Sequence, residues 1–583
     1  MNGSARTRML TGRDRRPIRP RIRDDLGSSR MGKYQMKFSM CLFWAMLLSG
    51  SVCWADSLTY SRDVAKVIHE KCSACHRPNS SGPFSLLTFE DVRTHSGTIK
   101  AVLEDDYMPP WKPKDHGVVF ANNRALTSAE KTQLIQWIDA GCPEGDPAET
   151  PSPPAYPDGW TLGKPDMVVR MNGQYEVPAD GPDIYRSFVF QLDLPEDKWV
   201  KAVELRPQAK SSVHHAIFFV DTNLVARTID GADGKVGIEG MSFLTSFGGS
   251  SSKDNESNQR QLGRSLLDRF RGKRSNGESD VSRTSEQLNR GLGGYVPGAT
   301  PNLLPGDLAM SLPKGSDIVM QTHFHPSGKR EIEQAELALY FADRPPSRPI
   351  VPVMIPAMFG FGAKLKVPAG KNDHRMSDSI TLPVDTQAIG VSGHAHYICR
   401  KMKLTATRPN GQSTILLDID DWDLDWQDQY LFEQPIDLPA GTVLETELIY
   451  DNSSENPENP FDPPREIRWG RGSTDEMGSV TLMTTARFKR DNAMLEATIR
   501  QHVVESLVDR STEDLVEMLM QLDNNHDGKL DPSETPPRFN RRMLKLLDRN
   551  NDGGLQKEEL MPMIKLRDLP FFQGQRNSAA PQP

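Results

Sequence analysis

The sequence predicts a multidomain protein: an all-α domain at the N-terminus, two all-β sandwiches of jelly-roll type in the middle, and an α-helical pair at the C-terminus. Three observations predict this architecture. The chain has 583 residues, which is too long for a single hydrophobic core. Short alternating apolar runs separated by Pro, Gly and Asp fill the middle of the chain. Apolar residues at helical spacing flank that region on both sides.

Residues 1–55 are predicted to be a basic leader and a secretory signal peptide. Lys33 and Lys37 precede the apolar run Met40–Leu48, and small residues lead to a cleavage site after Ala55. An uncleaved membrane anchor is the alternative, but the run is shorter than the roughly 20 apolar residues that a span requires. We therefore expect an exported protein, periplasmic or extracellular, with no membrane span after cleavage. The net charge of −8 gives no reason to expect nucleic acid as a partner.

Residues 57–148 are predicted to form the helical domain. Ser61–Lys71 has apolar residues at helical spacing, and a second helix begins at the capping box of Thr127 and Glu130. The Pro-rich residues 149–162 follow as a linker.

The central region is predicted to form two sandwiches, over residues 163–345 and 346–492. Many short strands with turn signals are typical of this fold class. The strand candidates are Ala216–Val220, Ile318–Thr322, Leu337–Phe341, Ala388–Ser392, Lys403–Ala406, Val443–Tyr450 and Ser479–Thr484. Residues 244–292 interrupt the pattern with Gly, Ser, Asn and Arg, which predicts a disordered insertion with a short helix over Leu262–Phe270.

Residues 505–570 contain two loops that fit the EF-hand calcium pattern, and residues 571–583 form a predicted disordered tail. Gly528 and Gly553 stand at the sixth loop position, where the chain turns. The predicted calcium ligands are Asp523, Asn525, Asp527, Lys529, Asp531 and Glu534 in the first loop, and Asp548, Asn550, Asp552, Gly554 and Glu559 in the second. One shared helix, Arg538–Leu547, fits between the loops, which favours a structural clamp for two calcium ions over an opening sensor.

Cys72, Cys75 and His76 form a Cys-x-x-Cys-His motif. This motif attaches c-type haem through two thioethers and ligates the iron through its histidine. A redox disulfide and half of a zinc site are the alternatives, but the predicted export, the helical context and the adjoining histidine favour haem. Met108, followed by two prolines, is the predicted second iron ligand. On these residues the helical domain resembles a class I cytochrome c.

Six dispersed residues of the β region carry the main functional signal. They are His214, His215 and His323, and His394, His396 and Met477. Three imidazoles, and two imidazoles with a thioether, suit copper rather than a closed structural zinc site. On a strand, His394 and His396 project to one face. His214 and His215 would project to opposite faces, so both can bind one metal only through a bulge or through distinct ring nitrogens.

The motifs around these residues resemble those of the copper type II, ascorbate-dependent monooxygenases, the family of peptidylglycine α-hydroxylating and dopamine β-monooxygenases. The matching segments are Ser212-Val-His-His215, Gln321-Thr-His-Phe324, Gly393-His-Ala-His396 and Thr474-Asp-Glu-Met477. The resemblance implies that the first three histidines hold an electron-storing copper and that the other two, with the methionine, hold a catalytic copper that binds dioxygen. It implies hydroxylation of a C–H bond in a small organic substrate, with ascorbate as a reductant.

Several residues depart from that family or compete with its ligands. His325 could replace His323, but the motif favours His323. The family's substrate-binding arginine, tyrosine and asparagine are here Ser392, Thr481 and Ser479, which implies a substrate other than a glycine-extended peptide. The remaining histidines with no matching context are predicted to be solvated, and they are His69, His95, His116, His374 and His502.

The haem motif and the copper motifs in one chain suggest a shared electron path. Covalent linkage raises effective concentration, so we expect the haem to replace or supplement ascorbate, with an external donor reducing the haem. Two other functions stay open from the sequence. One is a non-catalytic copper and haem electron-transfer protein, and the other is a calcium-dependent scaffold with a degenerate oxygenase fold.

Overall fold

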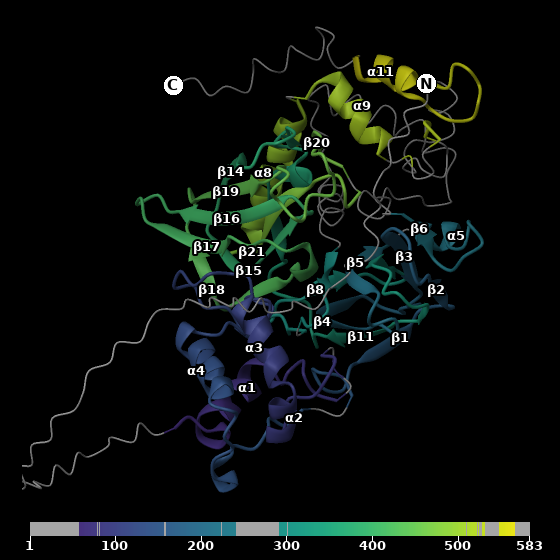
Figure 1. Ribbon diagram of the computed structural model, residues 1–583. Helices are drawn as coiled ribbons and strands as arrows, with labels where there is room; N and C mark the ends of the chain where they lie inside the picture. The colour runs from purple at the N-terminus through teal and green to yellow at the C-terminus, as the bar shows by residue number, and fades with distance from the viewer. Residues whose placement is uncertain are drawn as a thin grey trace, which may run out of the picture.

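The computed structural model describes residues 57–78, 80, 82–156, 159–222, 224–240, 291–299, 301–470, 472–508, 510–521, 523, 527–530 and 547–565. The predicted leader, the predicted helix over Leu262–Phe270, most of the helix between the calcium loops and the predicted tail lie outside these residues. The described chain runs from a helical region through two β regions to a second helical region (Figure 1).

The N-terminal region is helical. Its elements are η1 (Tyr60–Val64), α1 (Ala65–Lys71), α2 (Phe89–Thr94), α3 (Ser96–Glu104), α4 (Ser128–Asp139) and η2 (Pro147–Glu149). The predicted capping box is confirmed, because Glu130 N donates to Thr127 Oγ1 over 3.2 Å and Thr127 N donates to Glu130 Oε2 over 2.7 Å. Trp137 is fully buried with Ile68 and Leu134 in a core that belongs to this region alone.

The first β region is a sandwich of two main sheets. Its elements are β1 (Met167–Arg170), β2 (Tyr175–Val177), β3 (Ile184–Phe190), β4 (Lys198–Arg206), β5 (Val213–Asp221), α5 (Val225–Ile229), β6 (Ile238–Glu239), β7 (Gly291–Tyr295), β8 (Met310–Leu312), β9 (Asp317–Phe324), β10 (Glu331–Glu333) and β11 (Glu336–Phe341). The sheets have the orders β1-β11-β4-β8 and β6-β3-β9-β5-β7. Phe188 on β3 and Leu337 on β11 share one core, as facing sheets do. The predicted insertion is wrong at its end, because Gly291 and Leu292 belong to β7 and Leu292 is buried in that core.

The second β region repeats this architecture. Its elements are β12 (Val351–Ile355), η3 (Ala357–Gly360), β13 (Lys366–Val367), β14 (His374–Thr381), β15 (Thr386–Ala395), β16 (Cys399–Thr407), β17 (Ser413–Ile419), η4 (Leu424–Trp426), β18 (Gln429–Leu438), β19 (Val443–Tyr450), β20 (Ile467–Arg468), β21 (Gly478–Ala486) and η5 (Lys489–Asp491). The main sheets have the orders β12-β21-β15-β18 and β14-β19-β16-β17. Every predicted strand lies within an observed one. Helix α8 (Asn492–Val508) buries Leu495 in the same core, so this unit continues past residue 492, where the sequence predicted its end.

The helical region docks on the open edge of the second sandwich. Between α3 and α4 the chain runs beside the edge strand β18, where Ala121 N donates to Leu431 O over 2.8 Å and Glu433 N donates to Val119 O over 2.9 Å. Phe120 is buried in the core of the sandwich. Figure 1 shows the helical region against both β regions. The three parts therefore meet along one boundary.

The C-terminal region carries helices α9 (Thr512–Met520) and α11 (Lys557–Lys565). Leu530 and Leu555 join the two predicted calcium loops through a two-way backbone bridge of 3.0 and 2.9 Å. Among the described residues, we find no helix of the length and apolarity that a membrane span requires.

Candidate metal centres

Three histidines from two neighbouring strands form the first centre. His214 and His215 lie on β5 and His323 lies on β9, and each offers a ring nitrogen within 4.8 Å of the others. The adjacent histidines can face one point because a register shift between Val213 and His215 interrupts the ladder between β5 and β9. This is the bulge that two successive imidazoles on one metal require. The structure thus brings the three predicted imidazoles together.

The ring nitrogens of this centre fit a bound metal ion. The Nδ1 atoms of His214 and His215 lie 3.0 Å apart, as two nitrogens do that each lie about 2 Å from one ion. His323 is 2% exposed, and its Nδ1 has no hydrogen-bond partner in the described part of the chain. On the outer side of two rings, His214 Nε2 lies 2.6 Å from Asp425 Oδ1 and His323 Nε2 lies 3.0 Å from Asp183 Oδ2. Carboxylates in these places orient the rings of metal-binding histidines.

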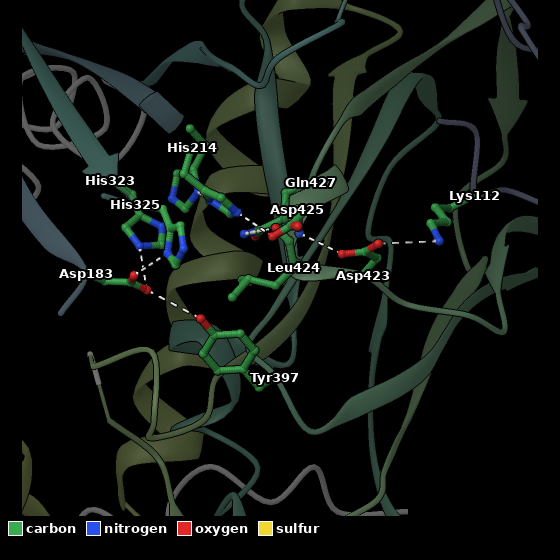
Figure 2. A network of polar contacts seen from close by, with 11 residues as sticks. Lys112, Asp183, His214, His323, His325, Tyr397, Asp423, Leu424, Asp425 and Gln427 are labelled. Carbon is green, nitrogen blue, oxygen red and sulfur yellow. Dashed lines mark hydrogen bonds and ion pairs between the residues drawn. The ribbon is translucent and has the colours of Figure 1, made fainter. Parts of the chain in front are cut away.

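Asp183 separates the roles of His323 and His325. The His323 side chain is 1% exposed and lies in the cluster, whereas the His325 side chain is 60% exposed. His325 Nδ1 lies 2.8 Å from Asp183 Oδ1, and Tyr397 donates to Asp183 Oδ2 over 3.4 Å (Figure 2). The ring of Tyr185 stacks on His323 at 4.3 Å. His323 is therefore the member of the centre, and His325 supports the carboxylate behind it. Sequence reasoning missed Asp183, because no motif marks it.

The second centre lies on the adjoining edge of the second sandwich. His394 and His396 project to the same face, with ring centroids 5.5 Å apart. The ladder between β15 and β21 pairs His394 with Ser479 and ends at the pair of Ala395 and Gly478. His396 and the buried Met477 come next beyond that pair, and opposite residues of an antiparallel pair share a face, so a continuation of this register would bring the thioether to the imidazoles. His394 Nδ1 lies 2.6 Å from Gln427 Oε1 and His396 Nδ1 lies 3.1 Å from Asp475 O, so the Nε2 atoms are the ring nitrogens that would bind a metal.

Glu476 fixes the backbone of the second centre. Its Oε1 accepts hydrogen bonds from the N–H groups of His396, over 2.5 Å, and Met477, over 2.8 Å. Its Oε2 accepts from Ile398 N over 3.1 Å. One buried carboxylate therefore ties the two strand ends that carry ligands. A signal was available in the sequence, because Glu476 lies next to Met477 within the motif.

Burial keeps these imidazoles neutral. It lowers the pKa of His394 to about 4 and that of His396 to about 3. Burial also lowers the pKa of His215 well below its ordinary value, and the imidazoles of His323, His214, His394 and His396 lower it further. The two centres are therefore within electrostatic reach of each other. Neutral imidazoles are the form that binds a metal.

A short segment between β17 and β18, Asp423–Asp428, joins the two centres, and we call it the junction segment. Asp425 orients His214 of the first sandwich (Figure 2), and Gln427 orients His394 of the second. Asp423 caps η4 by accepting from Asp425 N over 2.9 Å. The junction segment of the second sandwich thus positions one candidate metal ligand in each sandwich.

One cavity of about 1980 Å³ reaches both centres, and His215 and His394 are part of its lining. Beside His394, a row of four uncharged residues crosses the sheet and lines the cavity. The strand registers place them in the order Met354, Thr481, Ser392 and Gln429. A molecule bound beside His394 would therefore meet neutral polar and thioether side chains. Two of these residues are positions at which the sequence departs from the copper monooxygenases.

The turn after α1 carries the predicted haem motif. Cys72 and Cys75 are free thiols that are partly exposed. His76 Nδ1 lies 3.2 Å from Phe84 O, which fixes the ring and leaves its Nε2 side for an iron ion. These residues fit a covalently attached haem. Met108 lies in the loop after α3, and its role as the second iron ligand stays a prediction.

Both calcium loops show EF-hand turns in their described parts. Gly528 N donates to Asp523 Oδ2 over 2.8 Å, and Gly553 N donates to Asp548 Oδ2 over 3.0 Å. The two glycines have φ of +86° and +88°, as the sixth position requires. The predicted ligands Asp527, Lys529, Asn550, Asp552, Gly554 and Glu559 are described, and the predicted ligands Asn525, Asp531 and Glu534 lie outside the described residues.

The prediction that the other histidines are solvated is wrong for His69. Its side chain is buried at 5% exposure, and Nε2 lies 3.3 Å from Leu87 O. His69 follows Ile68 on α1, and the helix packs closely enough to cover both side chains. His502 is half-buried on α8, where Nε2 lies 2.9 Å from Asp378 Oδ2.

Comparison with known proteins identifies the C-terminal region. The EF hand family matches residues 515–535 and 541–563. No curated protein matches the chain. The chain is similar to the major capsid protein P2 from bacteriophage PM2, with 8% identity over 55% of this chain and 97% of that one and a TM-score of 0.21. It is similar to PNGF-II, with 9% identity over 55% of this chain and 65% of that one and a TM-score of 0.21. Likeness at that level carries no argument, so the established relationship is that residues 515–563 contain EF hands, the family of calcium-binding loops.

Proposed function

We propose that this protein is an exported, copper-dependent monooxygenase that hydroxylates a C–H bond of an organic substrate with dioxygen. A c-type haem in its helical region supplies electrons. One observation carries the proposal: two histidine clusters from different sandwiches open onto one cavity, through His215 and His394. A redox site beside a substrate-sized space is what an oxygenase requires.

The donor sets support copper at both clusters. His214, His215 and His323 would hold one ion through nitrogen, and the second cluster adds the soft sulfur of Met477, which favours Cu(I). Bound copper supplies one-electron redox chemistry and dioxygen activation. The chain's own contribution is to hold the rings: Asp183 and Asp425 orient the first cluster, and Glu476 fixes the backbone of the second.

The cavity favours an enzyme over an electron-transfer protein. A site for electron transfer alone needs no internal space for a substrate, yet the uncharged row beside His394 faces a large cavity. The substrate class that fits this row is an organic molecule whose reacting end is uncharged. The match to the copper monooxygenases at the four ligand motifs supports the same choice.

The test begins with metal analysis and haem spectroscopy of the purified full-length chain. We expect two copper ions, two calcium ions and one haem per chain. Dioxygen uptake is then measured with a panel of organic substrates under reducing conditions, and hydroxylated product is identified by mass spectrometry. A chain that binds both coppers and consumes dioxygen without forming any hydroxylated product would refute the oxygenase.

The substitution Met477→Ile isolates the second centre. X-ray absorption at the copper edge should lose its copper–sulfur signal, turnover should stop, and the haem spectrum should stay the same. Met483→Ile on β21, the strand that begins directly after Met477, is the matched control and should keep the copper–sulfur signal. Product formation at the original rate in Met477→Ile would exclude this site as the catalytic copper.

A further inference from the structure

We propose that Trp426 is the electron bridge between the helical region and both histidine clusters. The inference rests on the proposed function, because it requires haem at Cys75 and copper at the two clusters. It adds a route that the ligand motifs do not reveal: Trp426 stands in the junction segment between the residues that contact the two clusters, and its indole packs beside Tyr107.

On the copper side, the residues before and after Trp426 in the chain each contact one histidine cluster. The residue before it, Asp425, reaches His214 Nε2 over 2.6 Å. The residue after it, Gln427, reaches His394 Nδ1 over 2.6 Å. The main chain therefore links the indole to one contact with each cluster.

On the haem side, Trp426 adjoins the loop and the turn that would hold the iron. The ring of Tyr107, next to Met108, lies 6.1 Å from the indole at an angle of 68°. Cys75 Sγ donates to Gly298 O over 3.3 Å. A Cβ atom on Gly298 would lie 3.9 Å from Cys75 Sγ and 3.9 Å from Trp426 Cζ3. A single residue without a side chain, Gly298, therefore lies between the Cys75 thiol and the Trp426 indole.

Two ion pairs hold the junction segment against the helical region. Lys112 Nζ lies 3.8 Å from Asp423 Oδ2, and Arg124 donates to Asp428 Oδ2 over 2.9 Å. They bracket Trp426, with one on each side along the chain. The indole is thereby fixed at a constant distance from its neighbours.

Stability alone does not explain an indole at this position. Its Nε1 is buried and has no hydrogen-bond partner among the described residues. An unsatisfied buried donor costs about 1–3 kcal/mol, which a purely apolar side chain would avoid. The π system offers what such a side chain lacks, because it couples donor and acceptor orbitals better than saturated carbon does.

The transfer balances without a proton. The haem iron passes from Fe(II) to Fe(III), one electron crosses Trp426, and one copper passes from Cu(II) to Cu(I). An external one-electron reductant, such as ascorbate, then returns the haem iron to Fe(II). Two such transfers supply both copper ions.

The experiment measures this transfer directly in the full-length protein loaded with haem and Cu(II). The haem is photoreduced by a flash without oxygen, and its reoxidation is followed by its absorption. Freeze-quench electron paramagnetic resonance follows the loss of Cu(II). Trp426→Leu should slow haem reoxidation by about tenfold or more. Trp426→Phe keeps an aromatic ring and should stay close to the original rate, as should the control Trp199→Leu on β4.

The outcomes separate the bridge from the proposed function. Wild-type protein that lacks copper or haem, or in which flash-reduced haem never passes its electron to Cu(II), would overturn the proposed function. Trp426→Leu with full metal content, an unchanged haem potential and an unchanged transfer rate would overturn the bridge alone. If the leucine variant fails to fold, Trp426→Met gives the same readout, because methionine also lacks a π system and its side chain adapts to irregular space.

Discussion

The Phe120 ring is buried where the helical region docks on the second sandwich, and Phe120→Ala should release the helical region. Phe120 is 6% exposed and lies in the core of the second sandwich, although it belongs to the loop between α3 and α4. Its ring centroid lies 6.0 Å from Trp111, 5.8 Å from Tyr430 and 5.4 Å from Phe432. The substitution removes all three ring contacts and leaves the backbone hydrogen-bonding groups in place.

The expected cost follows from the burial and from the aromatic contacts. Replacing a core phenylalanine with alanine typically costs about 3–5 kcal/mol. An aromatic pair contributes about 0.5–1.5 kcal/mol beyond its buried area, and two of these three rings lie across the domain boundary. Because the ring packs at an edge that can partly close, we expect a cost at the lower end of this range, about 3 kcal/mol of docking free energy. That corresponds to a change of about 100-fold in the ratio of docked to undocked chain.

Hydrogen exchange at the boundary measures this ratio. The amides of Ala121 and Glu433 donate across it, to Leu431 O and Val119 O. Both should exchange about 100-fold faster in Phe120→Ala than in the original chain. Amides inside the sandwich core should be unaffected.

Val119→Ala is the matched control, because the neighbouring Val119 side chain is 58% exposed. Its exchange rates should be close to those of the original chain. If the two boundary amides exchange at the same rate in Phe120→Ala as in Val119→Ala, the buried Phe120 ring does not hold the helical region in place.

Three further predictions concern single groups. His323→Ala should remove one copper ion per chain by metal analysis, whereas the exposed His325→Ala should retain both; the opposite result would reverse the ligand assignment. The hydrogen bond that His502 donates to Asp378 raises the pKa of His502, so this pair stabilises the fold fully below the ordinary histidine pKa of about 6.5, and its contribution is lost as pH rises through the raised pKa. Thermal unfolding should therefore lose part of its pH dependence between neutral and mildly alkaline pH in His502→Phe, and an unchanged pH profile would contradict the pair's role. Glu559→Gln should abolish one of two calcium-binding events in titration calorimetry, since position twelve supplies a bidentate carboxylate; two undiminished events would place the calcium elsewhere.

The strands and the ligand clusters were largely predictable because their signals are local. Alternation of apolar residues depends on the two faces of a strand, so every predicted strand fell within an observed one. The EF-hand loops were predictable because twelve consecutive residues contain the whole pattern. Strand geometry predicted either a bulge at His214 and His215 or binding through distinct ring nitrogens, and the structure has the bulge.

The ligand partners and the domain contacts could not be predicted in the same way. Asp183 lies 140 residues before His323, and Asp425 lies more than 200 residues after His214. Aspartate and glutamine are common on surfaces, so nothing local distinguishes these from solvated residues. His69 was misjudged for the same reason, because its burial depends on how the helices pack.

The sequence by itself determined which candidate ligand groups this protein carries: the carboxylate loops of the EF hands, and the imidazole, thioether and thiol groups that we propose bind copper and haem. Only the tertiary structure decided which carboxylates orient those ligands and which parts meet. Ligand type is a property of single residues and short spacings, whereas the contacts of the junction segment with Tyr107, His214 and His394 depend on three domains packing together. Such proximity arises from long-range packing, which no local pattern of residues encodes.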